Sequence, residues 1–262
     1  ALHLNLGLTL KRLGRWTEAL VHYKKAFELR SSVMDPTHPR MLTLRNNMGN
    51  LYQGVDALEE AEKHLRFAYQ GRVDKLGRTH HWTIGSGDLL TFLMLTQHRF
   101  KEAWELYDAQ PTDVSGNTLL SRWLTKQNLF HLLVHDEKAK EALDVADWLL
   151  KNIPNGFEHM AHRIEIFRAE AQSMLDMRVD TGHIIDQSLP KSVERAGYNC
   201  MNIYYARSIV RTLRRLGGDV QAASFRRDFI DKANQELTES DSEWKDNTRA
   251  CLANLEAIPL QQ

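Results

Sequence analysis

The sequence predicts an all-α solenoid of about six helical pairs followed by a C-terminal capping helix. Three observations lead to this class. Leu, Ala, Glu, Lys and Arg are abundant while Pro occurs only six times, a composition that favours helices. A helical motif recurs at a spacing of 42 residues, and a helical pair must stack on its copies to bury its apolar face. No segment alternates apolar and polar residues as a half-buried strand would.

The first helical pair, over residues 1–30, defines the motif. It reads as a helix, a tight turn at Gly14 and a second helix, in which the small Ala19 lets the two helices approach closely. Moving along the chain by 42 residues returns the same small and large apolar classes, and a further 42 returns a third copy that has lost its last small residue but keeps the rest. Gly7, Leu10, Ala19, Tyr23 and Ala26 map onto Gly49, Tyr52, Ala61, Leu65 and Ala68, and then onto Thr91, Met94, Ala103, Tyr107 and Gln110. Residues 1–110 are therefore predicted to be a regular array of three repeats.

The connection between pairs repeats as well. Pro36 and Pro39 forbid a continuous helix, so the next helix is expected to begin near Pro39, and its partner to run from about residue 57 to 72. The segment 77–81 aligns with 35–39 at the same shift. We interpret His38 and His80, which occupy the same place in the two connections, as linker residues that pack beneath the helix turn.

Residues 111–262 depart from the 42-residue rhythm. The segment 111–117 breaks the helical pattern, and a boundary between two sub-arrays is expected there. A fourth pair is expected from about Trp123 to Pro154. The fifth pair is the poorest match, with one helix predicted over about 158–177 and a second over about 182–196 that must accommodate Pro190.

A sixth pair returns to the motif before the chain ends in a cap. Leu213, Gly217 and Ala222 repeat the spacing of the first turn. A last amphipathic helix over about 241–257 is predicted to cover the exposed end of the stack. Its apolar side consists of Trp244, Cys251, Leu252 and Leu255.

The motif of Gly7, Gly14, Trp16 and Ala19 resembles the tetratricopeptide repeat, whose basic unit of 34 residues is a little shorter. A 42-residue unit with an Asp-Pro-x-His-Pro connection and the helix at 46–52 is similar to the kinesin-light-chain subtype. Related repeats occur in bacterial signalling proteins, often beside Ser/Thr kinase domains. The resemblance implies a right-handed α-α superhelix whose first helices line a concave groove, and a non-catalytic scaffold that binds a peptide or partner protein there.

Four arginines form a stripe on the first helix of the sixth pair: Arg207, Arg211, Arg214 and Arg215. Guanidiniums on one stripe repel each other, and a site for the carboxylates or phosphates of an acidic partner would explain them. The alternative is a solvated face with Glu or Asp partners from neighbouring helices. On the binding hypothesis, Arg207→Glu with Arg211→Glu should abolish partner capture without lowering helicity.

Asn46, Asn47 and Asn50 form a second candidate site. The resemblance implies that asparagines on this helix hydrogen-bond the backbone of an extended peptide, since an amide both donates and accepts. In the alternative, these amides only brace neighbouring helices. The basic carboxylate clamp of chaperone-binding relatives is not reproduced residue for residue, so that function is not carried over.

No pattern predicts catalysis, a metal or a cofactor. Phosphate-cradling glycine loops, nucleophile elbows and kinase signatures are absent, so the chain is expected not to be an enzyme. Three histidine pairs lack the spacing of a complete ligand set, and structural roles are favoured for them: His131 with His135, His159 with His162, and His80 with His81. Trp16, Trp104, Trp123 and Trp148 fit helical core periods. Trp82, placed in a connection, is the exposed aromatic anchor.

Charge and cysteine usage limit the partners. With 34 basic and 34 acidic residues the chain has no global field that would attract nucleic acid or an anionic membrane. No apolar run approaches the roughly 18 residues of a membrane helix. Cys200 and Cys251 are too few for a disulfide framework, which fits a reducing, cytoplasmic location.

Two further hypotheses follow from how the chain is built. It begins at Ala1 inside a helical pattern, so we expect a fragment, and the second functional hypothesis is a regulatory or substrate-docking arm of a larger bacterial Ser/Thr kinase. The third is a sensor whose superhelix tightens around a small peptide. Because the repeats lose fidelity toward the fifth pair, the divergent C-terminal half is where a specific function is expected.

Overall fold

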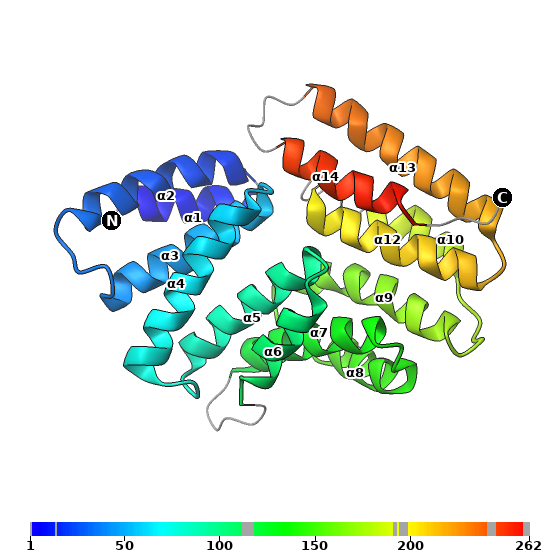
Figure 1. Ribbon diagram of the computed structural model, residues 1–262, viewed down its shortest axis with the longest axis horizontal. Coiled ribbons are helices and arrows are strands. Elements are labelled where there is room, and N and C mark those ends of the chain that lie inside the picture. Colours follow the sequence, from blue (N-terminus) through cyan, green and yellow to red (C-terminus); the bar gives the residue numbers. More distant parts are fainter. Residues whose placement is uncertain are drawn as a thin grey trace. The chain divides into compact units, whose positions relative to one another are not determined.

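The chain forms two compact units, Ala1–Ser121 and Arg122–Gln262, which are described separately as unit 1 and unit 2. The computed structural model describes residues 2–13, 15–111, 118–190, 193, 199–239 and 245–258. Over these ranges all regular structure is helical, and the predicted all-α class is confirmed (Figure 1). The predicted turn at Gly14 and most of the predicted break at 111–117 lie outside the described residues.

Unit 1 holds three helical pairs in chain order. They are α1 (Leu2–Arg12) with α2 (Trp16–Ser31), α3 (Pro39–Gly54) with α4 (Leu58–Leu76), and α5 (His81–Thr96) with α6 (Phe100–Asp108). Each helix packs on its neighbour in sequence, as stacked pairs require. The helix expected near Pro39 begins at that residue, and its partner runs one turn beyond the predicted end.

The two repeated connections end in the same helix cap. His38 precedes α3, and its Nδ1 accepts a hydrogen bond of 3.1 Å from the backbone N–H of Arg40. His80 precedes α5, and its Nδ1 accepts a hydrogen bond of 3.2 Å from the backbone N–H of Trp82. The interpretation that these histidines pack beneath the turn was therefore wrong. Each instead satisfies one of the N–H groups that the first turn of a helix leaves without a partner.

Small residues bring the two helices of each pair together. An added Cβ at Gly7 would lie 2.6 Å from the Tyr23 ring, and one at Gly49 would lie 2.5 Å from Leu65 Cγ. These contacts are 42 residues apart, as the repeat predicts. On the second helices, Ala19, Ala61 and Ala103 are fully buried.

Unit 2 holds three more pairs and a last helix. The fourth pair is α7 (Leu119–His135), which begins just before the division, with α8 (Ala139–Lys151). The fifth begins with the 3₁₀ turn η1 (Glu158–Met160) and α9 (Ala161–Ser173), and continues with α10 (Thr181–His183) and the π turn η2 (Ile184–Ser188). The sixth is α12 (Cys200–Arg215) with α13 (Asp219–Glu239), and α14 (Lys245–Glu256) follows.

The same turn joins the helices of all six pairs. In each, the backbone N–H of one residue bonds the carbonyl five residues before it at 2.9 to 3.0 Å, which is the Schellman pattern. The donors are Arg15, Ala57, Arg99, Lys138, Met177 and Gly218. The residue just before the donor has positive φ in every described turn: Asp56, His98, Glu137, Asp176 and Gly217. These turns align the fifth pair, which the sequence pattern left unaligned.

The fifth pair departs from the prediction after its turn. The first helix ends at Ser173 instead of 177, and the second becomes a π turn at 184–188. Pro190 explains why the helix widens into a π turn. Its ring nitrogen has no N–H, and in a regular α-helix the ring would collide with the carbonyl of Asp186. The other five second helices carry a buried alanine four residues after the turn donor, whereas the fifth has Thr181 there. The predicted end at 196 lies outside the described residues.

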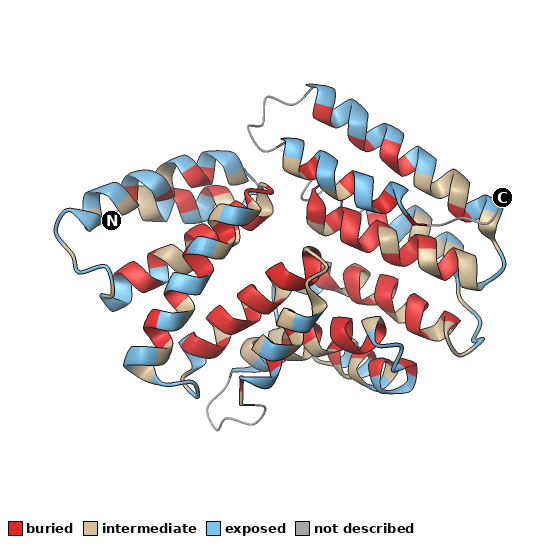
Figure 2. Cartoon of the chain, in the orientation of Figure 1, coloured by how far each residue is buried: buried red, intermediate tan, exposed pale blue. Residues whose placement is uncertain are grey.

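The core of unit 2 is built mainly from α7, α9 and α12 (Figure 2). His131 on α7 is fully buried, with its ring centroid 4.4 Å from that of Phe167. Tyr205 on α12 is buried in the same group. Trp123 is fully buried and donates from Nε1 to the Leu149 carbonyl at 2.9 Å, as its core assignment predicts.

The last helix caps unit 2 and is joined to it covalently. Leu252 and Leu255 on α14 are buried where the helix packs on α12 and α13, as predicted, whereas Trp244 lies outside the described residues. Cys200, the first residue of α12, and Cys251 of α14 form a disulfide. The expectation of a reducing compartment therefore loses the support that it drew from the cysteine count.

Candidate functional site

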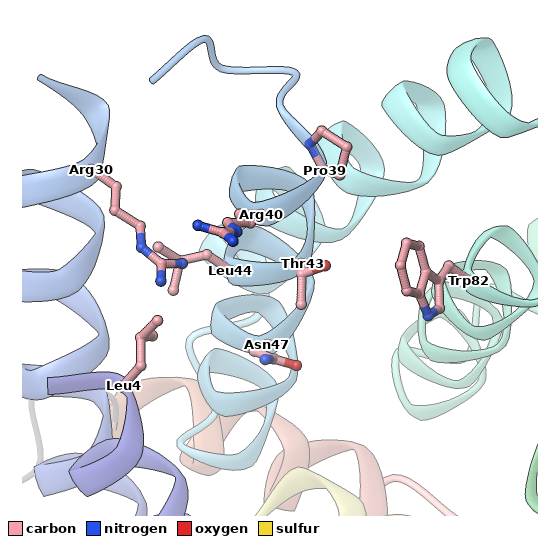
Figure 3. A pocket seen from close by; sticks show the side chains of 8 residues that line it. All are labelled: Leu4, Arg30, Pro39, Arg40, Thr43, Leu44, Asn47 and Trp82. Atoms are coloured by element: carbon pink, nitrogen blue, oxygen red, sulfur yellow. The ribbon is translucent and has the colours of Figure 1, made fainter. Parts of the chain in front are cut away.

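A pocket of about 180 Å³ lies in unit 1, where the first helices of its three pairs face the same hollow (Figure 3). We call it the arginine pocket. Its lining consists of Leu4 from α1, Arg30 from α2, Pro39, Arg40, Thr43, Leu44 and Asn47 from α3, and Trp82 from α5. The side chains of Thr43 and Asn47 point across the hollow toward Trp82, and Arg30 reaches toward Arg40. Apolar walls and convergent polar groups are the usual make-up of a binding pocket.

The two guanidiniums of the pocket have no carboxylate partner. Arg30 is partly exposed and Arg40 is exposed, and neither side chain makes an ion pair or hydrogen bond with any described residue. Two such cations directed toward each other repel, and an anionic group between them would relieve that repulsion. The pocket is therefore suited to a carboxylate.

A third arginine, Arg72, holds Thr43 and Trp82 of the pocket lining in place. The Arg72 side chain on α4 is buried, and its guanidinium donates to the Trp82 carbonyl at 2.8 Å and to Thr43 Oγ1 at 3.2 Å. Burial lowers the pKa of Arg72 to about 10. Arg72 thus ties α3 to α5 and bonds two residues of the pocket lining, Thr43 and Trp82. Trp82 is left 47% exposed at the first turn of α5, so it lies on a helix and not in a connection as predicted.

The three candidate asparagines have different surroundings. Asn46 accepts a hydrogen bond of 2.7 Å from Ser86 Oγ, which itself accepts one from Arg72, so Asn46 braces α3 against α5. Asn47 lines the arginine pocket, and its amide has no hydrogen-bond partner within the described part of the chain. Asn50 is partly exposed and is not part of the pocket lining. Of the three, Asn47 is the one whose amide faces open space beside Trp82.

The arginine stripe on α12 surrounds a buried carboxylate. Glu170 on α9 is fully buried; Arg211 Nε lies 2.8 Å from its carboxylate and Arg215 Nη1 3.3 Å. Ser208 donates to the same group at 2.6 Å. Burial raises the pKa of Glu170, and the two guanidiniums oppose that shift. Arg215 also pairs with Glu137, in the turn of the fourth pair, at 2.5 Å.

The other two stripe residues are held within unit 2 as well. Arg214 Nε lies 3.3 Å from the Asp219 carboxylate at the start of α13. Arg207 is partly buried, and this burial lowers the pKa of its guanidinium. Three of the four arginines thus have carboxylate partners from neighbouring segments of the same unit. Their positive charge is compensated inside the fold.

Several described histidines take structural positions, whereas the side chain of His159 lies outside what the structure describes. Burial, reinforced by Arg163, lowers the pKa of His131 to about 3, and burial lowers that of His64 to about 4. The rings of His80 and His81 stack at 4.4 Å. No group of three or more metal-ligating side chains is brought together in the described ranges. Among those same residues no helix has the length and apolar character needed to cross a bilayer.

With this geometry in view, the chain can be compared with known proteins. The sequence profile of the tetratricopeptide repeat family matches residues 1–72. The match covers α1 to most of α4, the segment where the 42-residue copies are most regular. No curated protein matches the chain at a significant level.

Solved tetratricopeptide repeat structures share the fold. One neighbour, a putative kinesin light chain of Podosopora anserina with nearly identical TPR-like repeats, has a TM-score of 0.50 at 14% identity, covering 73% of this chain and 94% of its own. A Rap protein, solved in complex with Competence and Sporulation Factor, has a TM-score of 0.57 at 10% identity, covering 97% of this chain and 73% of its own. At these identities the likeness concerns the fold alone, and it agrees with the predicted α-α solenoid.

Sequence reasoning missed Arg30, Arg40 and Arg72. Arg30 and Arg40 are on opposite sides of a connection, and no periodic pattern links them. A signal was present nonetheless: neither Arg30 nor Arg40 has an acidic residue three or four positions away that could pair with it along a helix, and Asp35 lies five positions from each, outside α2 and α3. Only the packing of α2 beside α3 shows that the two guanidiniums share one hollow.

Proposed function

We propose that the chain is a non-catalytic protein-interaction scaffold and that unit 1 binds an acidic peptide segment of a partner protein in the arginine pocket. The tetratricopeptide repeat fold generally mediates protein–protein interaction, and the Rap neighbour was solved with a bound factor. The observation that carries the proposal is the pair of unpartnered guanidiniums, Arg30 and Arg40, beside a free amide and a half-exposed indole.

Each element of the pocket suits one part of such a peptide. An Asp or Glu side chain, or a terminal carboxylate, would lie between Arg30 and Arg40 and form charge-assisted hydrogen bonds. The Asn47 amide can donate to a backbone carbonyl and accept from a backbone N–H, which holds an extended chain regardless of its side chains. An apolar or aromatic residue of the peptide would pack on Trp82. The expected ligand is therefore acidic and apolar within a few residues.

The other predicted contacts take supporting roles in this proposal. Asn46 fixes Ser86 and, through Arg72, the position of Trp82. The stripe arginines hold α12 to its neighbours: Arg207, Arg211 and Arg214. Their present interactions would have to break before they could contact a ligand. Breaking a buried pair costs about 3 to 5 kcal/mol, more than a surface contact with peptide would return. We therefore place the peptide contacts on Asn47 and not on the stripe.

Selection from a random peptide library displayed on phage tests this function. The full chain is immobilised, and the same library is selected in parallel on a chain carrying Arg30→Glu and Arg40→Glu. We expect the wild-type chain to enrich peptides that combine Asp or Glu with Trp, Phe, Tyr or Leu, and the charge-reversed chain to lose them. Trp82→Ala should shift the selected peptides toward purely acidic ones.

A matched control separates the pocket from net charge. Lys101→Glu with Arg227→Glu changes the charge by the same amount at exposed positions outside the pocket, on α6 and α13. This chain should enrich the same peptides as the wild type. Enrichment of basic or neutral peptides by the wild type, or of identical peptides by the pocket variant, would overturn the proposal.

A further inference from the structure

A second cavity lies in unit 2, away from the first helices. It has a volume of about 450 Å³ and is formed by the second helices of the fifth and sixth pairs, η2 and α13. Its walls are mainly apolar, with Ile185 and Leu189 on one side and Phe225 and Phe229 on the other. This volume is within the usual range for pockets that bind small molecules, about 300 to 1,000 Å³.

The cavity coincides with the place where the repeat is interrupted. The fifth pair replaces a regular second helix with the π turn η2, directly before Pro190. It also has Thr181 where every other pair places a buried alanine. Local π turns occur frequently at functional sites. The departure of the fifth pair therefore coincides with a hollow of about 450 Å³.

Two carboxylates belong to the lining of this apolar space. Asp186 comes from η2 and Asp228 from α13, so one carboxylate stands on each wall. Both are exposed, and neither makes an ion pair or side-chain hydrogen bond with a described residue. Lys232, one turn after Asp228, also lines the cavity and is likewise unpaired. The lining thus carries two negative charges against one positive charge.

We propose that this cavity binds a small ligand with an apolar body and one cationic group, an ammonium in the simplest case. The apolar body fills the space between the phenylalanines of α13 and the aliphatic side chains of η2, where burial of its surface provides most of the affinity. The cationic group lies at the rim between Asp186 and Asp228, which attract it from both walls. An anionic ligand of the same shape meets two carboxylates there and is rejected.

The site is independent of the proposed peptide site. It is built from second helices, in a different unit and with the opposite charge. A failure of the arginine pocket to bind acidic peptides would leave this proposal untouched, and the reverse also holds.

Three probes of the same shape and different charge test the proposal: 4-phenylbutylamine, 4-phenylbutanol and 4-phenylbutyrate. Each is titrated into the full chain by calorimetry and followed by backbone NMR shifts. We expect the amine to bind about fivefold more tightly than the alcohol, as a partly exposed ion pair would allow, and the carboxylate to bind most weakly. The shifted resonances should belong to η2 and α13.

Substitutions at the rim and in the cavity identify the site. Asp186→Asn with Asp228→Asn should reduce amine affinity to that of the alcohol, whereas Asp231→Asn, on the same helix but outside the lining, should leave it unchanged. Ile185→Trp should fill the cavity and block all three probes. The proposal is overturned if the butyrate binds as tightly as the amine, if no probe shifts η2 or α13, or if the double Asn variant binds the amine like the wild type.

Discussion

Unit 1 and unit 2 are built from the same helical pair but differ in whether their clustered arginines have carboxylate partners. The turns of unit 1 recur every 42 residues, whereas those of unit 2 follow at shorter and unequal intervals. In unit 2, arginines of α12 are neutralised by Glu170, Glu137 and Asp219. In unit 1, Arg30 and Arg40 face a hollow without any such partner among the residues that the structure describes. The regular half thus presents uncompensated arginines to a ligand, whereas most of the arginine stripe of the divergent half is neutralised.

The difference teaches that a row of arginines on one helix does not identify a binding site by itself. What decides is whether a neighbouring helix supplies a carboxylate, and that carboxylate can be distant in the sequence. Glu170 is 41 residues from Arg211 and reaches it only because α9 packs on α12. Charges that hold the fold together and charges that are free to bind should therefore respond differently to substitution.

The largest effect is expected from Arg211→Glu. It removes one partner of the buried Glu170 and places a second carboxylate beside it, which should cost about 4 kcal/mol in the free energy of unfolding. Arg30→Glu, in the arginine pocket, should change it by no more than about 0.5 kcal/mol. Urea denaturation followed by circular dichroism measures both.

A rescue variant separates the ion pair from other effects of the substitution. Adding Glu170→Gln to Arg211→Glu removes the repulsion and should restore part of the lost stability. Equal losses for Arg211→Glu and Arg30→Glu would break the contrast between the units. The sequence-based expectation was that Arg207→Glu with Arg211→Glu leaves helicity unchanged. The ion pairs of Arg211 replace it with an expected loss of stability.

Removing the disulfide should loosen unit 2 and spare unit 1. The bond between Cys200 and Cys251 closes a loop across a sequence separation of 51 residues, and loss of such a link typically costs about 2 to 4 kcal/mol. Cys251→Ser should lower the stability of unit 2 and raise hydrogen exchange in α14, with little change in α1 to α5. Dithiothreitol should do the same to the wild type and nothing further to the variant; a wild type insensitive to dithiothreitol would contradict the link.

Acid should weaken the core of unit 2 through His131. Its folded-state pKa of about 3 is below the unfolded value of about 6.5, so the unfolded chain takes up the proton first as the pH falls. Stability is then lost progressively below about pH 6.5, by about 2 kcal/mol between pH 7 and pH 5. His131→Gln should remove this part of the pH dependence.

The buried His64 of unit 1, with a pKa lowered to about 4, should behave in the same way. His64→Gln and His131→Gln therefore form a matched pair, measured by urea titration at pH 7 and pH 5. If both variants keep the wild-type difference between the two pH values, the buried histidines are not the source of acid sensitivity.

The smallest effect is expected at the turns. Asp176 has a φ of 54° in the turn of the fifth pair, a conformation that costs a residue with a side chain more than it costs glycine. Asp176→Gly should stabilise unit 2 by about 0.5 to 1 kcal/mol. Gly217→Ala, at the matching position with a φ of 76°, should destabilise it by about 1 kcal/mol. Thermal unfolding measures the two shifts, which must have opposite signs.

The helical pairs of unit 1 could be predicted because periodic positions determine them. Gly7 opposite Tyr23 and Gly49 opposite Leu65 express the same packing requirement at a 42-residue shift. The fifth pair could not be aligned, because its second helix lacks the buried alanine and is interrupted by a π turn, while its turn at Asp176, like those at Asp56, His98 and Glu137, has no glycine. A left-handed Asp or Glu leaves only a weak signal in the sequence.

The candidate site was less predictable than the fold. Asn47 and Trp82 were singled out from the sequence, and the structure brings both to one hollow. The arginines beside them belong to different helices, so their proximity is a product of packing and not of spacing. The cavity between η2 and α13 was equally inaccessible, since it depends on the π turn before Pro190.

The central claim is that uncompensated charge in unit 1, and not the paired charge of unit 2, binds the partner. Its most direct test is the Kd of one display-selected acidic peptide, measured by calorimetry for three chains: the wild type, Arg30→Glu with Arg40→Glu, and Lys101→Glu with Arg227→Glu. We predict a loss of about 100-fold or more for the pocket variant, since two charge-assisted hydrogen bonds are removed, and no change for the control. Equal affinities for the pocket variant and the control would contradict the account.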